Sequence, residues 1–144
     1  MMTLEEYRMD GTFIKYNAHP KKMIVNDCVK RALSFATGID YMEMARYLNK
    51  IKREVNAKEF NQTIVWKTFI DKHSYAFNKI SFPAEKGIVR MNGLRFANSH
   101  PKGMFILRTA HHLTVCYNGS IVDTWDCRDK CVYNAYEVIA DVKF

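Results

Sequence analysis

The order of hydrophobic periodicities along the chain is the strongest constraint on its fold. Residues 26–73 carry apolar side chains mostly at helical spacing, whereas the residues after 78 form short β-like runs broken by glycine and proline. Helices followed by antiparallel strands predict an α+β domain with N-terminal helices packed on a C-terminal antiparallel sheet. With 144 residues, 48% of them hydrophobic, the chain has room for one core. We therefore expect a single domain over residues 1–144.

Three helices are expected in the first half, over residues 26–38, 40–51 and 61–73. Asn26 or Asp27 serves as the N-cap of the first helix and a glycine ends it, which places Cys28 in the first helical turn. The second helix begins at an acidic capping pair, and basic residues close its last turn. The inward-facing positions of the third helix would be Ile64, Val65, Thr68 and Phe69.

The second half contains a β-hairpin signal. Residues 104–108, 113–117 and 120–125 are β-type runs, and Asn118-Gly119 separates the last two. Asn-Gly between such runs favours a two-residue hairpin loop. In that register His112, which opens one strand, lies diagonal to Asp123 on the next, within reach of a hydrogen bond.

These elements bring together a thiol and two side chains that can activate it. A helix N-terminus stabilises a thiolate, and Cys28 has that position. A histidine within reach would complete the activation, and a carboxylate that orients the imidazole would make it efficient. Cys28, His112 and Asp123 are therefore the candidate catalytic residues.

The same residues resemble the pattern of papain-like cysteine peptidases, in which a cysteine begins a helix, a histidine lies on a strand, and Asn or Asp follows on the next strand. Asp123-Thr124-Trp125 is similar to the family's Asn-Ser-Trp segment, whose tryptophan shields the histidine, and this implies that role for Trp125. The Asp-Cys-Val-x-Arg-Ala start of the helix at residue 27 and the Asp-Thr-Trp-Asp segment are also similar to those of small papain-like proteins of bacteriophages and bacteria. The resemblance implies a papain-like fold and a Cys-His-Asp site.

One position departs from that family. Papain-like enzymes usually carry a glutamine about six residues before the cysteine, as a donor to the oxyanion, and this chain has Lys22 there. The backbone N–H of Cys28 can supply one donor, and the side chain of Asn26 would supply a second if its loop folds back.

Several neighbouring residues offer alternatives. His111 competes with His112, which we favour because it directly precedes the apolar strand. Asp126 competes with Asp123 as the orienting carboxylate, although an aspartate there also fits a turn cap. Cys116 is on the same strand face as His112, and a buried core position describes it better than a catalytic one.

The remaining sequence features lead to expectations about cofactors, partners and cellular location. We expect no metal and no cofactor, because the C-x3-C pair Cys127 and Cys131 has no second pair at zinc-finger spacing. The net charge of +7 allows a nucleic-acid partner, but the basic residues are scattered, so a protein or peptide substrate is favoured. The acidic N-terminus and the absence of an apolar run of ~20 residues lead us to expect a cytoplasmic protein, in the host cytoplasm if phage-encoded, with free thiols and no membrane partner.

The leading functional hypothesis is a cysteine hydrolase of the peptidase, isopeptidase or amidase type that works through a thioester intermediate. The alternative is a non-catalytic papain-like binding protein, encoded by a phage and acting on a host protein or on nucleic acid. The oligomeric state is not indicated by the sequence.

Overall fold

The computed structural model describes residues 11–144. The first ten residues, on which part of the expectation about export signals rests, lie outside the described part. The described chain runs in the order β1 (Phe13–Lys15), α2 (Cys28–Thr37), α3 (Tyr41–Glu54), α4 (Thr63–Lys72), a 3-10 turn (Ser74–Ala76), β2 (Phe77–Ser81), α5 (Gly93–Ser99), β3 (Met104–Thr109), β4 (His112–Tyr117), β5 (Ser120–Asp123) and β6 (Asn134–Val138).

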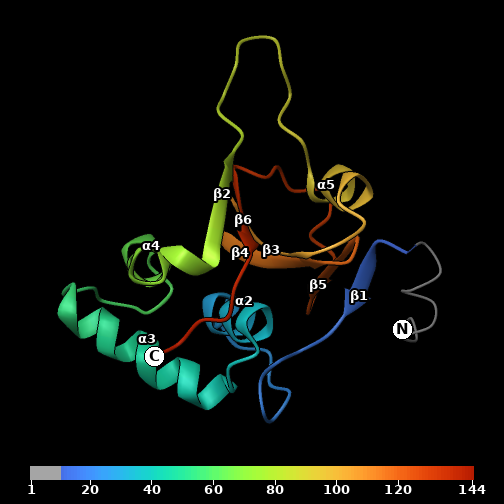
Figure 1. The fold of residues 1–144 in the computed structure, drawn as a ribbon. Coiled ribbons are helices and arrows are strands. Elements are labelled where there is room, and N and C mark those ends of the chain that lie inside the picture. The colour runs from blue at the N-terminus through green and yellow to red at the C-terminus, as the bar shows by residue number, and fades with distance from the viewer. Residues whose placement is uncertain (1–10) are drawn as a thin grey trace.

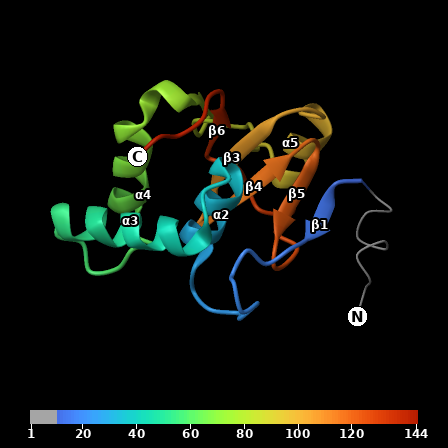
Figure 2. The ribbon, with the colours of Figure 1, turned by 60° about the horizontal axis from the view of Figure 1, so that its bottom comes forward.

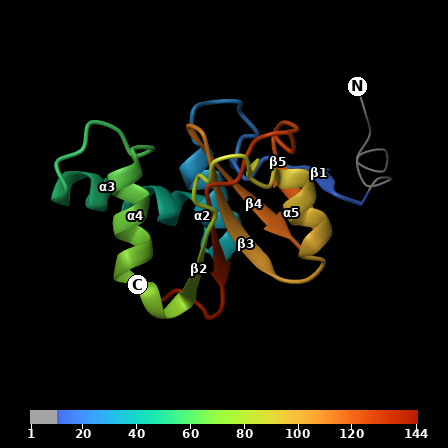
Figure 3. The ribbon, with the colours of Figure 1, turned by 90° about the horizontal axis from the view of Figure 1, so that it is seen from above.

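The strands form one six-stranded sheet in the order β1-β5-β4-β3-β6-β2. β1 pairs in parallel with β5, and every other pairing is antiparallel. Helices α2, α3 and α4 lie on one side of the sheet and α5 lies on the other (Figures 1 and 3). The α+β class predicted from the sequence is thus confirmed, but the sheet is mixed rather than antiparallel throughout.

The strict order of helices first and strands afterwards was wrong in two places. The three-residue strand β1 precedes the helices and completes one edge of the sheet beside β5. The seven-residue helix α5 lies among the strands, where glycine and proline had suggested only short β-like runs. Both elements are too short for periodicity to reveal them, because a helix of fewer than two turns shows no repeat and neither does a strand of three residues.

Local signals explain the ends of the first two helices. Gly38 ends α2 in the left-handed conformation, with φ of 74°, and its N–H donates to the carbonyl of Ser34. Asp40 begins α3, and its carboxylate accepts hydrogen bonds from the N–H groups of Met42 and Glu43. Both boundaries agree with the sequence prediction, although α3 continues to Glu54.

The third helix was predicted less accurately. α4 begins at Thr63 rather than at Asn61, and Ile64 is 53% exposed although an inward position was expected. Thr68 is only half-buried, whereas Val65 and Phe69 are fully buried as predicted. Ile64 belongs to the first turn of α4, where it borders the cavity described below instead of the core.

The hairpin has the predicted register. Tyr117 pairs with Ser120, and the ladder between β4 and β5 continues to Val115 and Val122. Asn118 and Gly119 both have positive φ, of 47° and 80°, as the two-residue loop requires. β5 ends at Asp123, so the residues after it leave the sheet earlier than the predicted range of 120–125.

Two groups of buried apolar side chains occupy the two faces of the sheet. One joins α2, α3 and α4 to Ile106, Leu113 and Val115. The other joins α5 to Leu107 and Cys116, and therefore confirms the core position expected for Cys116. Figure 2 shows α2 beside β4, where it connects the helical layer to the hairpin. Within residues 11–144, no helix has the length and apolar character needed to cross a membrane.

Candidate active site

Cys28 lies at the start of α2, the position expected from the sequence. It is the first helical residue and is partly buried. Because the first N–H groups of a helix have no partner within it, the thiol lies beside a local excess of positive charge. Asp27 occupies the N-cap position, but its carboxylate does not cap the helix. It accepts hydrogen bonds from Tyr41, at 2.7 Å, and from Arg31.

His112 and Asp123 are brought into direct contact by the hairpin. Nε2 of His112 lies 2.7 Å from Oδ2 of Asp123, across the diagonal of the β4–β5 ladder. The turn before β4 also holds His112, because the hydroxyl of Thr109 donates to its backbone carbonyl at 3.1 Å. On the far side of the carboxylate, the N–H of Thr124 donates to Oδ1 of Asp123 at 2.7 Å. Nε2 is thus engaged by Asp123, and Nδ1 is the ring nitrogen left for the thiol.

Arg31 links the helix to the hairpin and was not identified from the sequence as a site residue. Its guanidinium contacts the carboxylate of Asp27 and lies 3.5 Å from Oδ1 of Asp123. The side chains of Arg31 and Asp123 are only 11% and 4% exposed, so this pairing is shielded from water. Arg31 therefore places a fixed positive charge one helical turn after Cys28.

The surroundings of Cys28 favour its thiolate. Burial alone would raise the pKa of the thiol, but hydrogen bonds from His112 and from the backbone N–H of Leu113 lower it. The positive charges of His112 and Arg31 lower it further, and the net pKa is below the ordinary value for cysteine.

The histidine is affected in the opposite direction. Burial would lower the pKa of His112, but hydrogen bonds with Asp123, Cys127 and Cys28 and the charge of Asp123 raise it to about 11. Burial likewise would raise the pKa of Asp123, and its bond to His112 holds that pKa below the usual range. At neutral pH these directions favour a thiolate–imidazolium pair oriented by a carboxylate.

Trp125 and Cys127 border the His112–Asp123 pair. The rings of Trp125 and His112 have centroids 5.1 Å apart and are tilted by 51°, so the indole covers part of the imidazole although it is 43% exposed. Cys127 is buried, and its Sγ lies 3.6 Å from Oδ2 of Asp123. The pKa of the Cys127 thiol is raised, chiefly by burial, which favours its neutral form, whereas the pKa of the Cys28 thiol is shifted in the opposite direction.

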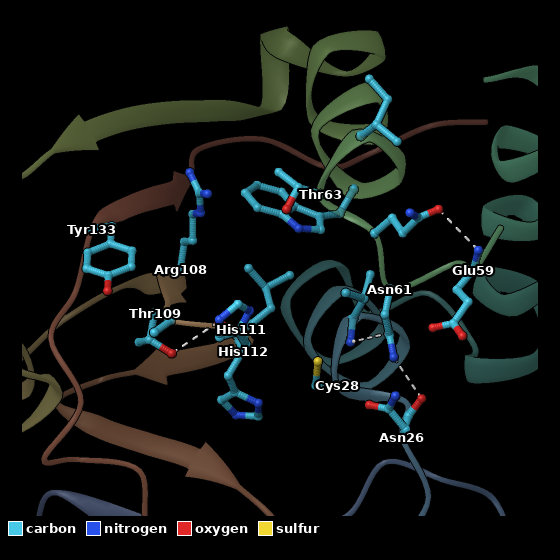
Figure 4. Close-up of a pocket in the computed structure, with 16 residues that line it drawn as sticks. Asn26, Cys28, Glu59, Asn61, Thr63, Arg108, Thr109, His111, His112 and Tyr133 are labelled. Carbon is cyan, nitrogen blue, oxygen red and sulfur yellow. Dashed lines mark hydrogen bonds between the residues drawn. The ribbon is translucent and has the colours of Figure 1, made fainter. Parts of the chain in front are cut away.

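Asn26 borders the same cavity as Cys28 (Figure 4), and Asn61 fixes the intervening backbone. Nδ2 of Asn61 donates to the carbonyl of Asn26 at 2.8 Å, and its Oδ1 accepts from the N–H of Val29 at 3.4 Å. Lys22 does not line this cavity. Its ammonium donates to the carbonyl of Asn17 and lies over an exposed tyrosine ring. The N–H of Cys28 has no partner within the helix, and the Asn26 side chain lines the same cavity, so these two groups are the candidate oxyanion donors.

A cavity of about 800 Å³ opens beside Cys28. It lies between the start of α2, the residues that lead into α4, and the turn that joins β3 to β4. Figure 4 shows the Cys28 sulfur and the His112 ring at its base, with polar side chains on both walls. Trp66 is 4% exposed and also contributes to one wall.

The alternatives left open by the sequence are separated by this geometry. His111 is exposed in the β3–β4 turn with φ of 54°, while His112 holds the carboxylate. Asp126 receives hydrogen bonds from Arg128, at 2.7 Å and 2.8 Å, instead of replacing Asp123 as the partner of His112.

His112, Asp123 and Cys127 are the one group of three or more metal-ligating side chains that converge among the described residues, with ligand atoms within 4.8 Å of one another. Cys131 forms the C-x3-C sequence pair with Cys127. It is exposed and is not part of this group. The donor set is of a zinc type, but the Arg31 guanidinium, 3.5 Å from Oδ1 of Asp123, places a positive charge beside it that opposes a divalent cation.

Arg31, Asn61 and Cys127 are the site residues that sequence reasoning missed. Arg31 had a usable signal, because it lies one turn from both Asp27 and Cys28 on the helix and its charge complements an aspartate at that spacing. Asn61 and Cys127 had no such signal, since their roles depend on loops that return from elsewhere in the fold.

The chain matches no family model, no curated protein and no solved structure.

Proposed function

We propose that this protein is a papain-like cysteine hydrolase that cleaves an amide, isopeptide or related acyl bond of a protein or peptide substrate. The observation that carries the proposal is the 2.7 Å contact between Nε2 of His112 and Asp123, formed beside a helix-terminal cysteine whose pKa is lowered. A buried carboxylate that orients an imidazole toward a thiol is the arrangement that activates cysteine nucleophiles.

The mechanism follows from the protonation states. The Cys28 thiolate attacks the carbonyl carbon of the substrate, and the resulting oxyanion accepts hydrogen bonds from the backbone N–H of Cys28 and the amide of Asn26. As the C–N bond breaks, the His112 imidazolium gives its proton to the leaving amine, and a thioester remains. Neutral His112 then takes a proton from water, hydroxide attacks the thioester, and the acid and the thiolate–imidazolium pair are released. Asp123 holds the imidazole in the required tautomer throughout.

A non-catalytic binding protein on the same scaffold is the second candidate. Its support is Lys22, which stands where related enzymes carry an oxyanion-donating glutamine and which points its ammonium at Asn17 instead of the cavity. Such a protein, encoded by a phage, would use the cavity to hold a host protein without turnover. A nucleic-acid partner would show itself by binding that weakens steeply with salt.

The first experiment is the pH dependence of alkylation by iodoacetamide, with peptide mapping of each cysteine. We expect Cys28 to react well below the ordinary thiol pKa of ~8.5 and at least about tenfold faster than exposed Cys131 at pH 6.5. His112→Ala should remove this preference, and His111→Ala should leave it intact. Equal labelling of the two cysteines in the wild-type protein would refute the nucleophile.

The second experiment separates hydrolase from binding protein. Hydroxylamine traps thioesters as hydroxamates, so incubation with a peptide library and hydroxylamine should yield peptide hydroxamates with wild-type protein and none with Cys28→Ala. Reactive Cys28 without hydroxamate or hydrolysis product from any peptide, isopeptide or amide would favour the binding protein.

A further inference from the structure

Arg108 lies on the wall of the cavity beside Cys28. It belongs to β3, four residues before His112, and its side chain is half-buried. Its Nη1 lies 3.5 Å from Oδ1 of Asn134, and its guanidinium carbon is 5.8 Å from the ring centroid of Trp66. Both of these partners are neutral, so neither balances the charge of Arg108.

Across the part of the chain that the structure describes, no carboxylate lies within ion-pair distance of Arg108. A guanidinium has five N–H donors in a fixed fork and no acceptor. The single long contact with Asn134 leaves most of these donors to water or to a ligand in the cavity. The guanidinium lies over the Trp66 ring, at a distance where a cation–π interaction holds it on that side of the cavity.

The opposite wall has a different character. Figure 4 shows Arg108 and Tyr133 on the side of the β-strands, and Glu59 and Asn61 on the side of the helices, with Cys28 between the two walls. An anionic group in the cavity is therefore attracted toward Arg108 and repelled from Glu59.

We propose that the substrate carries a carboxylate and that Arg108 binds it while Cys28 attacks the scissile carbonyl. This inference rests on the proposed hydrolase function. The carboxylate is that of an acidic side chain or of a chain terminus, since a guanidinium fork recognises both in the same bidentate way. Arg108 thereby selects substrates by charge on one side of the scissile bond and takes no part in the proton transfers.

The test uses paired alkylating probes, which need no knowledge of the natural substrate. Bromoacetamides that end in a carboxylate are compared with the same molecules ending in a primary amide, over a series of linker lengths. The second-order rate of Cys28 labelling is measured for each probe at pH 6.5. We expect the ratio of acid to amide rates to peak at one linker length, at about tenfold, and to return toward one in Arg108→Gln.

Two further variants control for net charge and for folding. Arg46→Gln removes the same charge from an exposed position on α3, and it should keep the wild-type ratio. Arg108→Lys retains the charge without the fork, and it should keep a reduced preference. Unchanged rates with the amide probes in Arg108→Gln would show that the site is still folded.

The labelling rates test the role of Arg108 separately from the proposed hydrolase function. Rapid labelling of Cys28 with no acid preference at any length, or with a preference that survives Arg108→Gln, overturns the role of Arg108 and leaves the hydrolase proposal standing. Slow labelling of Cys28 by all probes overturns both. At the best length, a peptide probe with an internal glutamate and an amidated end is compared with one that has a free C-terminal carboxylate, and the faster of the two identifies the source of the carboxylate.

Discussion

Replacement of Asp123 by asparagine tests the coupling on which the site depends. Asparagine has nearly the same shape and keeps a hydrogen-bond acceptor for Nε2 of His112, but it removes the negative charge. The charge matters because both side chains are shielded from water, with only 11% of His112 and 4% of Asp123 exposed. The change should therefore alter the titration of His112 without rebuilding the hairpin.

The size of the effect follows from the geometry. The two atoms in contact are 2.7 Å apart, and the delocalised charges are about 4 Å apart, where a pair of unit charges is worth about 4 kcal/mol at an effective dielectric constant of about 20. That free energy corresponds to about 3 pKa units. The pKa of His112, which the site raises to about 11, should fall to about 8 in Asp123→Asn.

The assay is a pH titration of the imidazole by NMR on protein labelled with 15N in histidine, with His112 assigned by its absence in His112→Gln. The matched control is Asp126→Asn, which removes a carboxylate bound by Arg128 and should leave the titration of His112 within about 0.5 pKa units. A fall of less than about 1 unit in Asp123→Asn would refute the electrostatic account of the pair.

The same coupling makes a prediction about stability. A histidine whose pKa rises on folding stabilises the protein fully below its unfolded value of about 6.5 and loses that contribution as the pH rises through its folded value. For the wild-type protein this loss ends near the pKa of about 11. The free energy of unfolding, measured with urea, should therefore differ most between wild type and Asp123→Asn below about pH 8, and the difference should close toward pH 11.

Two other changes probe the frame around the site. Arg31→Gln leaves the buried carboxylates of Asp27 and Asp123 without their shared cation, so we expect the free energy of unfolding to fall by about 3 kcal/mol and Cys28 alkylation to shift to higher pH. A smaller loss than that of exposed Arg46→Gln would contradict this role. Gly38→Ala places a side chain at a φ of 74°, which should cost about 1 kcal/mol in urea unfolding. Gly38→Asn should cost less, because asparagine tolerates that conformation, and equal losses would argue against backbone strain.

The sequence by itself determined the local parts of this protein. Gly38 and Asp40 mark helix ends through conformations and hydrogen bonds that involve only their immediate neighbours. Asn118-Gly119 set the hairpin register, and the register alone places His112 diagonal to Asp123. Contacts of this kind are predictable because the chain between the partners is short and its conformation is prescribed by a few residues.

Other features were decided only by the tertiary structure. The parallel pairing of β1 with β5 joins segments more than 100 residues apart, and nothing in three residues specifies that partner. Arg31 reaches Asp123 across 92 residues, and Asn61 reaches the Asn26 backbone across 35. Such contacts depend on how the helices pack on the sheet, which is a collective result of burying many apolar side chains, so the residues next to a polar side chain do not specify its distant partner.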